Sequence, residues 1–193
     1  NCWTMSGGEN WQFSNTTGSN HIGDNGTITG NTVTNNYFAW VDDSTPDYSD
    51  VTLVSPLIDA SSLTTPRLTF YELSNNEGNQ NSTLTVEVWD GAAWINMAVY
   101  NSNTIGGWEK KTISLSTLTI TGNIQVRFIY AGDTSGFYDD IAIDDVTVDE
   151  TPSTPPTCAT NFVATIDANC GNNPTVLTWD TATFADGYTI TMG

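Results

Sequence analysis

The chain has 193 residues, of which 22 are acidic and four are basic, so its formal net charge at pH 7 is −18. A hydrophobic content of 38%, with seven Trp, seven Tyr and seven Phe, is enough for a packed core and excludes a disordered acidic tail. Nucleic acids and anionic membranes are bound through basic surfaces, so the charge argues against both as partners. We also expect no membrane insertion, because no apolar run approaches the roughly 20 residues of a membrane span.

Residues 1–148 predict an all-β domain, because short runs of alternating apolar and polar residues follow one another without a helical apolar stripe. In one such run, Leu84, Val86 and Val88 form the apolar face. The strands expected in chain order are 37–41, 51–58, 67–73, 84–89, 94–100, 108–114, 124–130 and 141–148. About ten strands in a domain of this size fit a two-sheet jelly-roll sandwich, in which each sheet buries one face.

Residues 149–157 are Pro-rich and lack apolar side chains, which predicts an extended and fairly stiff linker. A second domain is then expected over residues 158–193. Its predicted strands are 162–166, 176–179 and 188–190, with Trp179 and Tyr188 as core aromatics. Three strands make only a partial β-sandwich.

Four aspartates, Asp139, Asp140, Asp144 and Asp145, flank or occupy the strand expected at 141–148. Neighbouring carboxylates raise one another's pKa, and partial burial makes an unpaired anion costlier still. Four basic residues cannot neutralise 22 acids, so a hard divalent cation is the expected partner, and we predict structural calcium (Ca2+). The alternative is a solvated acidic rim without an ion, and Asp139 and Asp140 are expected to belong to such a rim.

Three cysteines leave two interpretations open. Cys158 and Cys170 are predicted to close a short loop as a disulfide in an oxidising compartment, or to stay reduced as structural thiols. Cys2 has no obvious partner within the chain. The one histidine, His21, has no nucleophile motif around it, so we predict that the chain is not an enzyme.

Several stretches, taken in order over about residues 2–148, resemble a MAM (meprin/A5/mu) domain, the adhesion-type jelly roll of extracellular receptors and bacterial surface proteins. These stretches are 53–57, 67–71, 84–88, Trp94, Trp108 and 141–146. The cysteine set of the animal domains is missing, so the chain resembles the bacterial, Bacteroidetes-type branch. Residues 156–193, with Leu177-Thr178-Trp179-Asp180 and Gly187-Tyr188-Thr189-Ile190, are similar to the start of a fibronectin type III module.

The resemblance and the charge argument together imply that Asp144 and Asp145 hold the calcium ion. Asp42, Asp43 and Asp47 follow the strand expected at 37–41 and are predicted to supply further oxygens. Successive side chains of a strand face opposite ways. We therefore expect one aspartate of the 144–145 pair to bind the ion directly and the other to orient the loop or face solvent.

These features predict a non-catalytic extracellular adhesion or interaction module of a larger, secreted surface protein, stabilised by calcium and acting through a protein partner or self-association. One alternative is the carbohydrate-binding module of a secreted hydrolase, with glycan contacts from Trp89, Tyr71 and Tyr138. Another is a subunit of an extracellular filament that is completed by strand donation.

Overall fold

In the computed structural model the chain divides into two compact units, Asn1–Thr151 and Pro152–Gly193. The structure describes residues 2–7, 11–16, 30–31, 37–42, 50–74, 82–101, 104, 107–132, 140–153, 159–165 and 176–182. These residues form thirteen strands and no helix, so the all-β prediction is confirmed. Within the same residues, no helix is long and apolar enough to cross a membrane.

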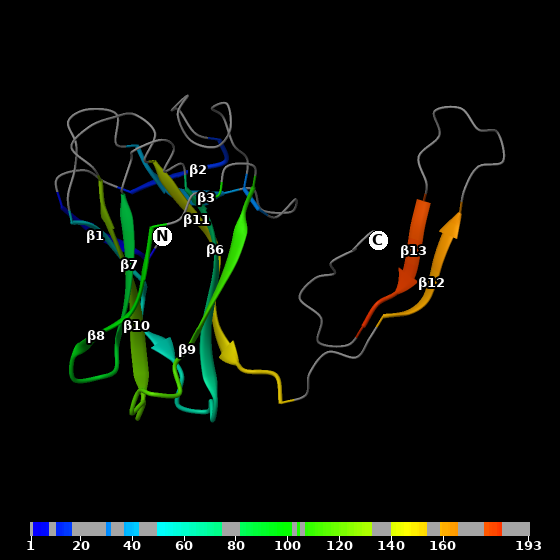
Figure 1. The fold of residues 1–193 in the computed structure, drawn as a ribbon. Helices are drawn as coiled ribbons and strands as arrows, with labels where there is room; N and C mark the ends of the chain where they lie inside the picture. The colour runs from blue at the N-terminus through cyan, green and yellow to red at the C-terminus, as the bar shows by residue number, and fades with distance from the viewer. Residues whose placement is uncertain are drawn as a thin grey trace. The chain divides into compact units, whose positions relative to one another are not determined.

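A six-stranded antiparallel sheet forms one layer of the first unit (Figure 1). Its main path runs β1-β4-β10-β7-β8, and β5 pairs with the beginning of β10. The strands are β1 (Thr4–Ser6), β4 (Val51–Val54), β5 (Ile58–Asp59), β7 (Thr83–Trp89), β8 (Trp94–Tyr100) and β10 (Asn123–Ala131).

A five-stranded antiparallel sheet in the order β2-β3-β11-β6-β9 forms the other layer. Its strands are β2 (Gln12–Ser14), β3 (Phe38–Val41), β6 (Pro66–Ser74), β9 (Glu109–Ser114) and β11 (Ile141–Glu150). The two layers confirm the predicted two-sheet sandwich. Strand β11, which carries two of the predicted calcium ligands, lies at the centre of this second sheet.

Two details of the strand pattern differ from the sequence-based expectation. The strand expected at 51–58 is two strands, β4 and β5, because Pro56 has no N–H for a ladder hydrogen bond. Ser55 directly follows β4, and its Oγ accepts a hydrogen bond from the backbone N–H of Val126 at 2.9 Å. Strands β1 and β2 were not expected, because three residues are too few to show an alternating pattern.

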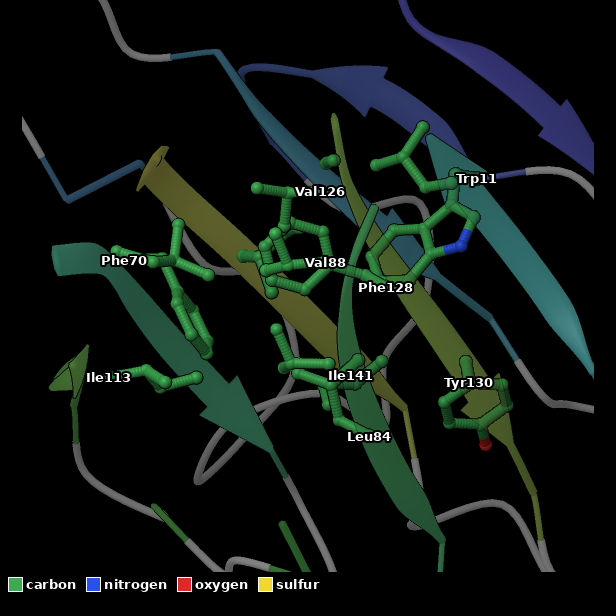
Figure 2. Packing of buried hydrophobic residues seen from close by; sticks show 14 of the residues in the cluster. Trp11, Phe70, Leu84, Val88, Ile113, Val126, Phe128, Tyr130 and Ile141 are labelled. Atoms are coloured by element: carbon green, nitrogen blue, oxygen red, sulfur yellow. The ribbon is translucent and has the colours of Figure 1, made fainter. Parts of the chain in front are cut away.

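The core lies between the two sheets (Figure 2). Every second residue of β7 and β10 is fully buried, so the period of two along each strand determines which face meets the core. Phe70 of β6 and Phe128 of β10 meet edge to face, with ring centroids 5.1 Å apart, and so connect the two sheets. Trp11 is also buried, and its indole N–H donates to the carbonyl of Val51 at 3.1 Å.

The centre of the five-stranded sheet is buried on both faces. A second apolar cluster, made of Phe38, Trp40, Leu73 and Ala142 with Trp108 packed against it, covers the face that points away from the main core. Consequently all four residues of β3 and the first four residues of β11 are buried. Polar groups in this part of β11 therefore have little access to water.

Strand β11 ends in a set of hydrogen bonds at Glu150, two residues beyond the strand expected from the sequence. The exposed carboxylate accepts hydrogen bonds from the hydroxyls and backbone N–H groups of Thr64 and Thr65, at 2.6 to 2.9 Å. The hydroxyls of Thr64 and Thr65, with the two N–H groups, lower the pKa of Glu150 to about 2. The backbone N–H of Thr151 also donates to the carbonyl of Thr65. The start of the segment predicted as a linker is thus held on the sandwich.

The second unit contains an antiparallel pair, β12 (Thr160–Thr165) and β13 (Val176–Asp180). The rings of Phe162 and Trp179 stack at 6.2 Å with an interplanar angle of 19°. The strand expected at 188–190 lies outside the described residues. Cys158 and Cys170 lie outside them as well, so their disulfide stays a prediction.

Replacing Glu150 with Gln should reduce the acid sensitivity of the first unit. The folded-state pKa of Glu150 is below its ordinary value of 4.5, so its ionised form adds stability above that value. This contribution is lost as the pH falls from about 4.5 to about 2. In denaturant unfolding across this window, the wild type should lose more stability than Glu150→Gln. Equal losses in the two proteins would contradict the hydrogen bonding described for Glu150.

Candidate ligand site at the Asp144–Asp145 bulge

A β-bulge interrupts the ladder between β11 and β6 at the acidic pair. Asp144 lies opposite Tyr71 and Thr147 lies opposite Thr69, so two residues, Asp145 and Val146, share one position of the partner strand. Asp145 has a φ of 50°, in the left-handed region that Asp tolerates better than most residues with a Cβ. The bulge therefore changes the direction of the side chains at this point.

Both carboxylates of the pair bind the same residue, Asn31. The Asn31 backbone N–H donates to Oδ2 of Asp144, and its side-chain Nδ2 donates to Oδ2 of Asp145, each at 2.8 Å. The backbone N–H of Asp145 donates to Oδ1 of Asp144, also at 2.8 Å. The expectation that the two side chains face opposite ways is wrong here, because the bulge breaks the alternation on which it relied.

Asp144 carries its charge in a poorly hydrated position. Its residue is 8% exposed, and burial raises the pKa of its carboxyl group. The N–H groups of Asn31 and Asp145 act in the opposite direction, and the negative charge of Asp145 raises the pKa further. Any cation beside the pair would stabilise the ionised form of Asp144.

The two carboxylates lie at a pocket of about 200 Å³ that draws residues from both sheets. Its aromatic walls are Trp3, Phe13, Tyr37 and Phe38. Tyr37 is 60% exposed, whereas Phe38 is buried. Apolar walls with a small number of polar groups are typical of ligand pockets in proteins.

The structure does not bring Asp42 to this pair. Ile141 of β11 pairs with Val41 of β3, so the register continued by one residue sets Asp42 opposite Asp140. Asp144 lies four positions further along β11, about 13 Å away at the usual rise of a strand. Calcium binds oxygen at about 2.3 to 2.6 Å, so one ion cannot bind both Asp42 and Asp144.

Asp140 is fully buried, at 0% exposure. The expectation that it belongs to a solvated rim is therefore wrong, because it directly precedes the stretch of β11 that is buried on both faces. Asp139, Asp43 and Asp47 lie outside the described residues. Within the described part of the chain, no group of three or more His, Cys, Asp or Glu side chains is arranged to hold a metal ion. A calcium ion at Asp144 and Asp145 would thus need amide, backbone or water oxygens as well.

Of the predicted glycan contacts, the two that the structure describes lie on different sheets. Trp89 lies on the outer face of the six-stranded sheet, with its ring centroid 6.0 Å from that of Trp94 across the β7–β8 hairpin. The guanidinium of Arg127 lies 4.3 Å from the centre of the Trp94 ring and forms an ion pair with Glu87. Tyr71 is on β6 of the other sheet. Tyr138 lies outside the described residues.

Asn31, Trp94 and Arg127 were missed as site residues. Asn31 is separated from Asp144 by 113 residues, and no motif marks it in so Asn-rich a sequence. Trp94 resembled a packing aromatic of the core, whereas the structure leaves it half-buried on the outer face. Trp94 pairs with Trp89, which points outward, and residues directly opposite each other share a face of the sheet. This pairing could have indicated that Trp94 lies on the outer face.

The two antiparallel sheets of the first unit define it as a jelly-roll sandwich. The model of the MAM domain family (meprin/A5/mu) matches residues 2–158. The chain therefore belongs to the MAM domain family. No match was found among the curated proteins.

Solved structures share the fold at low sequence identity. The K1 cleaved adhesin domain of Lys-gingipain from Porphyromonas gingivalis W83 has a TM-score of 0.52 at 14% identity, covering 78% of this chain and 92% of that one. The K3 adhesin domain of the same protein has a TM-score of 0.50 at 16% identity, covering 76% and 91%. A carbohydrate-binding module, TmCBM61, solved in complex with β-1,4-galactotriose, has a TM-score of 0.49 at 15% identity, covering 76% and 86%. The likeness to the adhesin domains shows a shared fold.

Substitutions at Asp145 should reveal the left-handed backbone of the bulge. Asp145→Gly and Asp145→Ala both remove the hydrogen bond from Asn31 Nδ2. Only Ala pays the steric cost of a positive φ, so the Gly variant should be the more stable by about 1 kcal/mol. Urea unfolding of both variants in EDTA measures the difference. An Ala variant as stable as the Gly variant would show that this conformation is not kept in solution.

Proposed function

We propose that the chain is a non-catalytic extracellular interaction module of a larger secreted surface protein. The observation that carries this proposal is the pocket at the bulge, where aromatic side chains and two carboxylates converge. Membership of the MAM family supports the extracellular setting. The likeness to adhesin domains is consistent with a role in binding other macromolecules.

Calcium at Asp144 and Asp145 is the second part of the proposal, and its role would be structural. The bulge gathers both carboxylates at Asn31, and an amide oxygen is among the ligands that calcium accepts. An ion bound there would offset the burial of the Asp144 charge. Asp42 remains a candidate only for a separate ion beside Asp140. Asp43 and Asp47 lie outside the described residues and remain predicted calcium ligands.

The second unit is proposed as the beginning of a fibronectin type III-like module. The antiparallel β12–β13 pair and the stacking of Phe162 on Trp179 support this assignment. A filament in which a neighbour donates a strand to this unit is the alternative. The proposal of a bacterial, Bacteroidetes-type surface protein rests on the missing animal cysteine set, since the chain has only three cysteines.

Calcium should raise the thermal stability of the chain. At a free concentration of 100 times the dissociation constant, an ion bound only by the folded state adds about 2.7 kcal/mol, or about 5 to 10 °C in unfolding temperature. Thermal unfolding in EDTA, followed by a calcium titration with magnesium as the control, measures this effect. Asp145→Asn should abolish the rise. Asp42→Asn is the matched control, because Asp42 lies about 13 Å from Asp144.

If calcium does not change the unfolding temperature of the wild type, the pair binds no structural ion. If the calcium-dependent rise in unfolding temperature persists in Asp145→Asn but disappears in Asp42→Asn, the ion binds at the Asp140 end of β11.

Glycan binding is a second candidate function, favoured by the pairing of Trp89 with Trp94 on the outer sheet face. Sugar rings present C–H faces that pack on indole rings, and their hydroxyls accept hydrogen bonds from groups such as the Arg127 guanidinium. On a glycan array, Trp89→Ala should weaken binding at least about tenfold, or about 1.4 kcal/mol. Trp89→Phe keeps an aromatic face and should retain most of the binding. No binding by the wild type, or equal binding by the Ala variant, would exclude this role for Trp89.

A further inference from the structure

The outer strands of the two sheets differ in how well they are protected against pairing with another chain. Free strand edges present unpaired backbone groups, and proteins usually shorten them or place charges and proline on them. Strands β1 and β2 have three residues each, and β5 has two. Strand β9 is longer but carries Glu109, Lys110 and Lys111. All four therefore have one of the usual protections.

Strand β8 lacks these protections. It is seven residues long, with the sequence Trp-Ile-Asn-Met-Ala-Val-Tyr, and contains neither a charge nor a proline. It lies at the end of the six-stranded sheet, and β7 is the one strand paired with it among the described residues (Figure 1). Within the described part of the chain, no strand pairs with the other edge of β8.

The side chains of β8 add apolar surface to this edge. Val99 is 58% exposed and Ile95 is 36% exposed. A bulge at Met97 turns the Met97 side chain toward the core. Among the features of β8, this bulge is the one that disfavours pairing with a further strand. Covering Val99 and Ile95 would remove apolar area from water on both sides of the bulge.

We propose that β8 pairs antiparallel with β8 of a second copy of this chain. Such a pair, related by a two-fold axis, would join two six-stranded sheets into one continuous sheet. This pairing rests on the proposed role of the chain as an interaction module. A second copy would be the partner in that role, and β8 would be the surface.

The charge of the chain favours a second copy at this place over other parts of its surface. Two chains of net charge −18 repel each other. Strand β8 has no charge of its own, and the nearest acid on the neighbouring strand, Glu87, is neutralised by Arg127. An antiparallel pairing of one strand with itself is self-complementary, so it needs no second type of surface.

The same charge predicts an unusual salt dependence. Raising the ionic strength from about 0.1 M to about 1 M shortens the screening length from about 10 Å to about 3 Å. The repulsion between two copies then decreases, while the apolar contact at β8 does not. Association should therefore strengthen with salt, whereas an interface held by ion pairs would weaken.

Analytical ultracentrifugation of the full chain tests the pairing over about 1 µM to about 1 mM protein, a range that covers weak dimers. Reducing conditions are needed, because Cys2 is exposed and free. We expect a reversible monomer–dimer equilibrium that tightens with sodium chloride. Val99→Lys places like charges at the interface and should raise the dissociation constant at least about tenfold.

Thr112→Lys is the matched control, because it adds the same charge to an exposed, β-branched position of the other outer strand, β9. This variant should associate like the wild type, and thermal unfolding checks that both variants fold. A monomer at all concentrations in 1 M salt, or equal association of Val99→Lys and the wild type, would overturn the β8 pairing. A strictly monomeric chain whose unfolding temperature still rises with calcium would leave the calcium site intact.

Discussion

The antiparallel ladder that holds β11 between β3 and β6 is the constraint on which the rest of the structure depends. The first four residues of β11 are buried, so the carboxylate of Asp144 has little access to water. The bulge at Asp145 directs the carboxylates of Asp144 and Asp145 to Asn31. Both the candidate ion site and the pocket are thus consequences of where β11 lies in its sheet.

Three of the four basic side chains, those of Arg67, Lys111 and Arg127, form ion pairs within the sandwich. Arg67 pairs with Asp149 at 2.8 Å, and Arg127 pairs with Glu87. Lys111 lies 3.1 Å from the buried carboxylate of Glu72 and faces the ring of Tyr100 on the opposite sheet. Burial alone would lower the pKa of Lys111, but Glu109 and Glu72 raise it, so the amine stays protonated. These pairs leave charge compensation at Asp144 to hydrogen bonds, and to an ion if one binds.

The sequence predicted the strands correctly where apolar and polar residues alternate along the chain. Leu84, Val86 and Val88 alternate with polar residues, and the structure buries all three in the core. The same rule failed at Asp144 and Asp145, because a bulge depends on how two distant strands meet and leaves no mark in the local pattern. Asn31 was missed for the same reason, since only the tertiary fold brings it to the pair.

The hydrogen bonds around Glu150 have a mechanical consequence for a module within a longer chain. Tension that enters at Thr151 meets the bond from its N–H to Thr65 and the four bonds that Glu150 accepts. Behind them, β11 is bonded along both sides, so a pull along its axis loads the ladder bonds to β3 and β6 together rather than one after another. The exit point of this domain is built to resist shear.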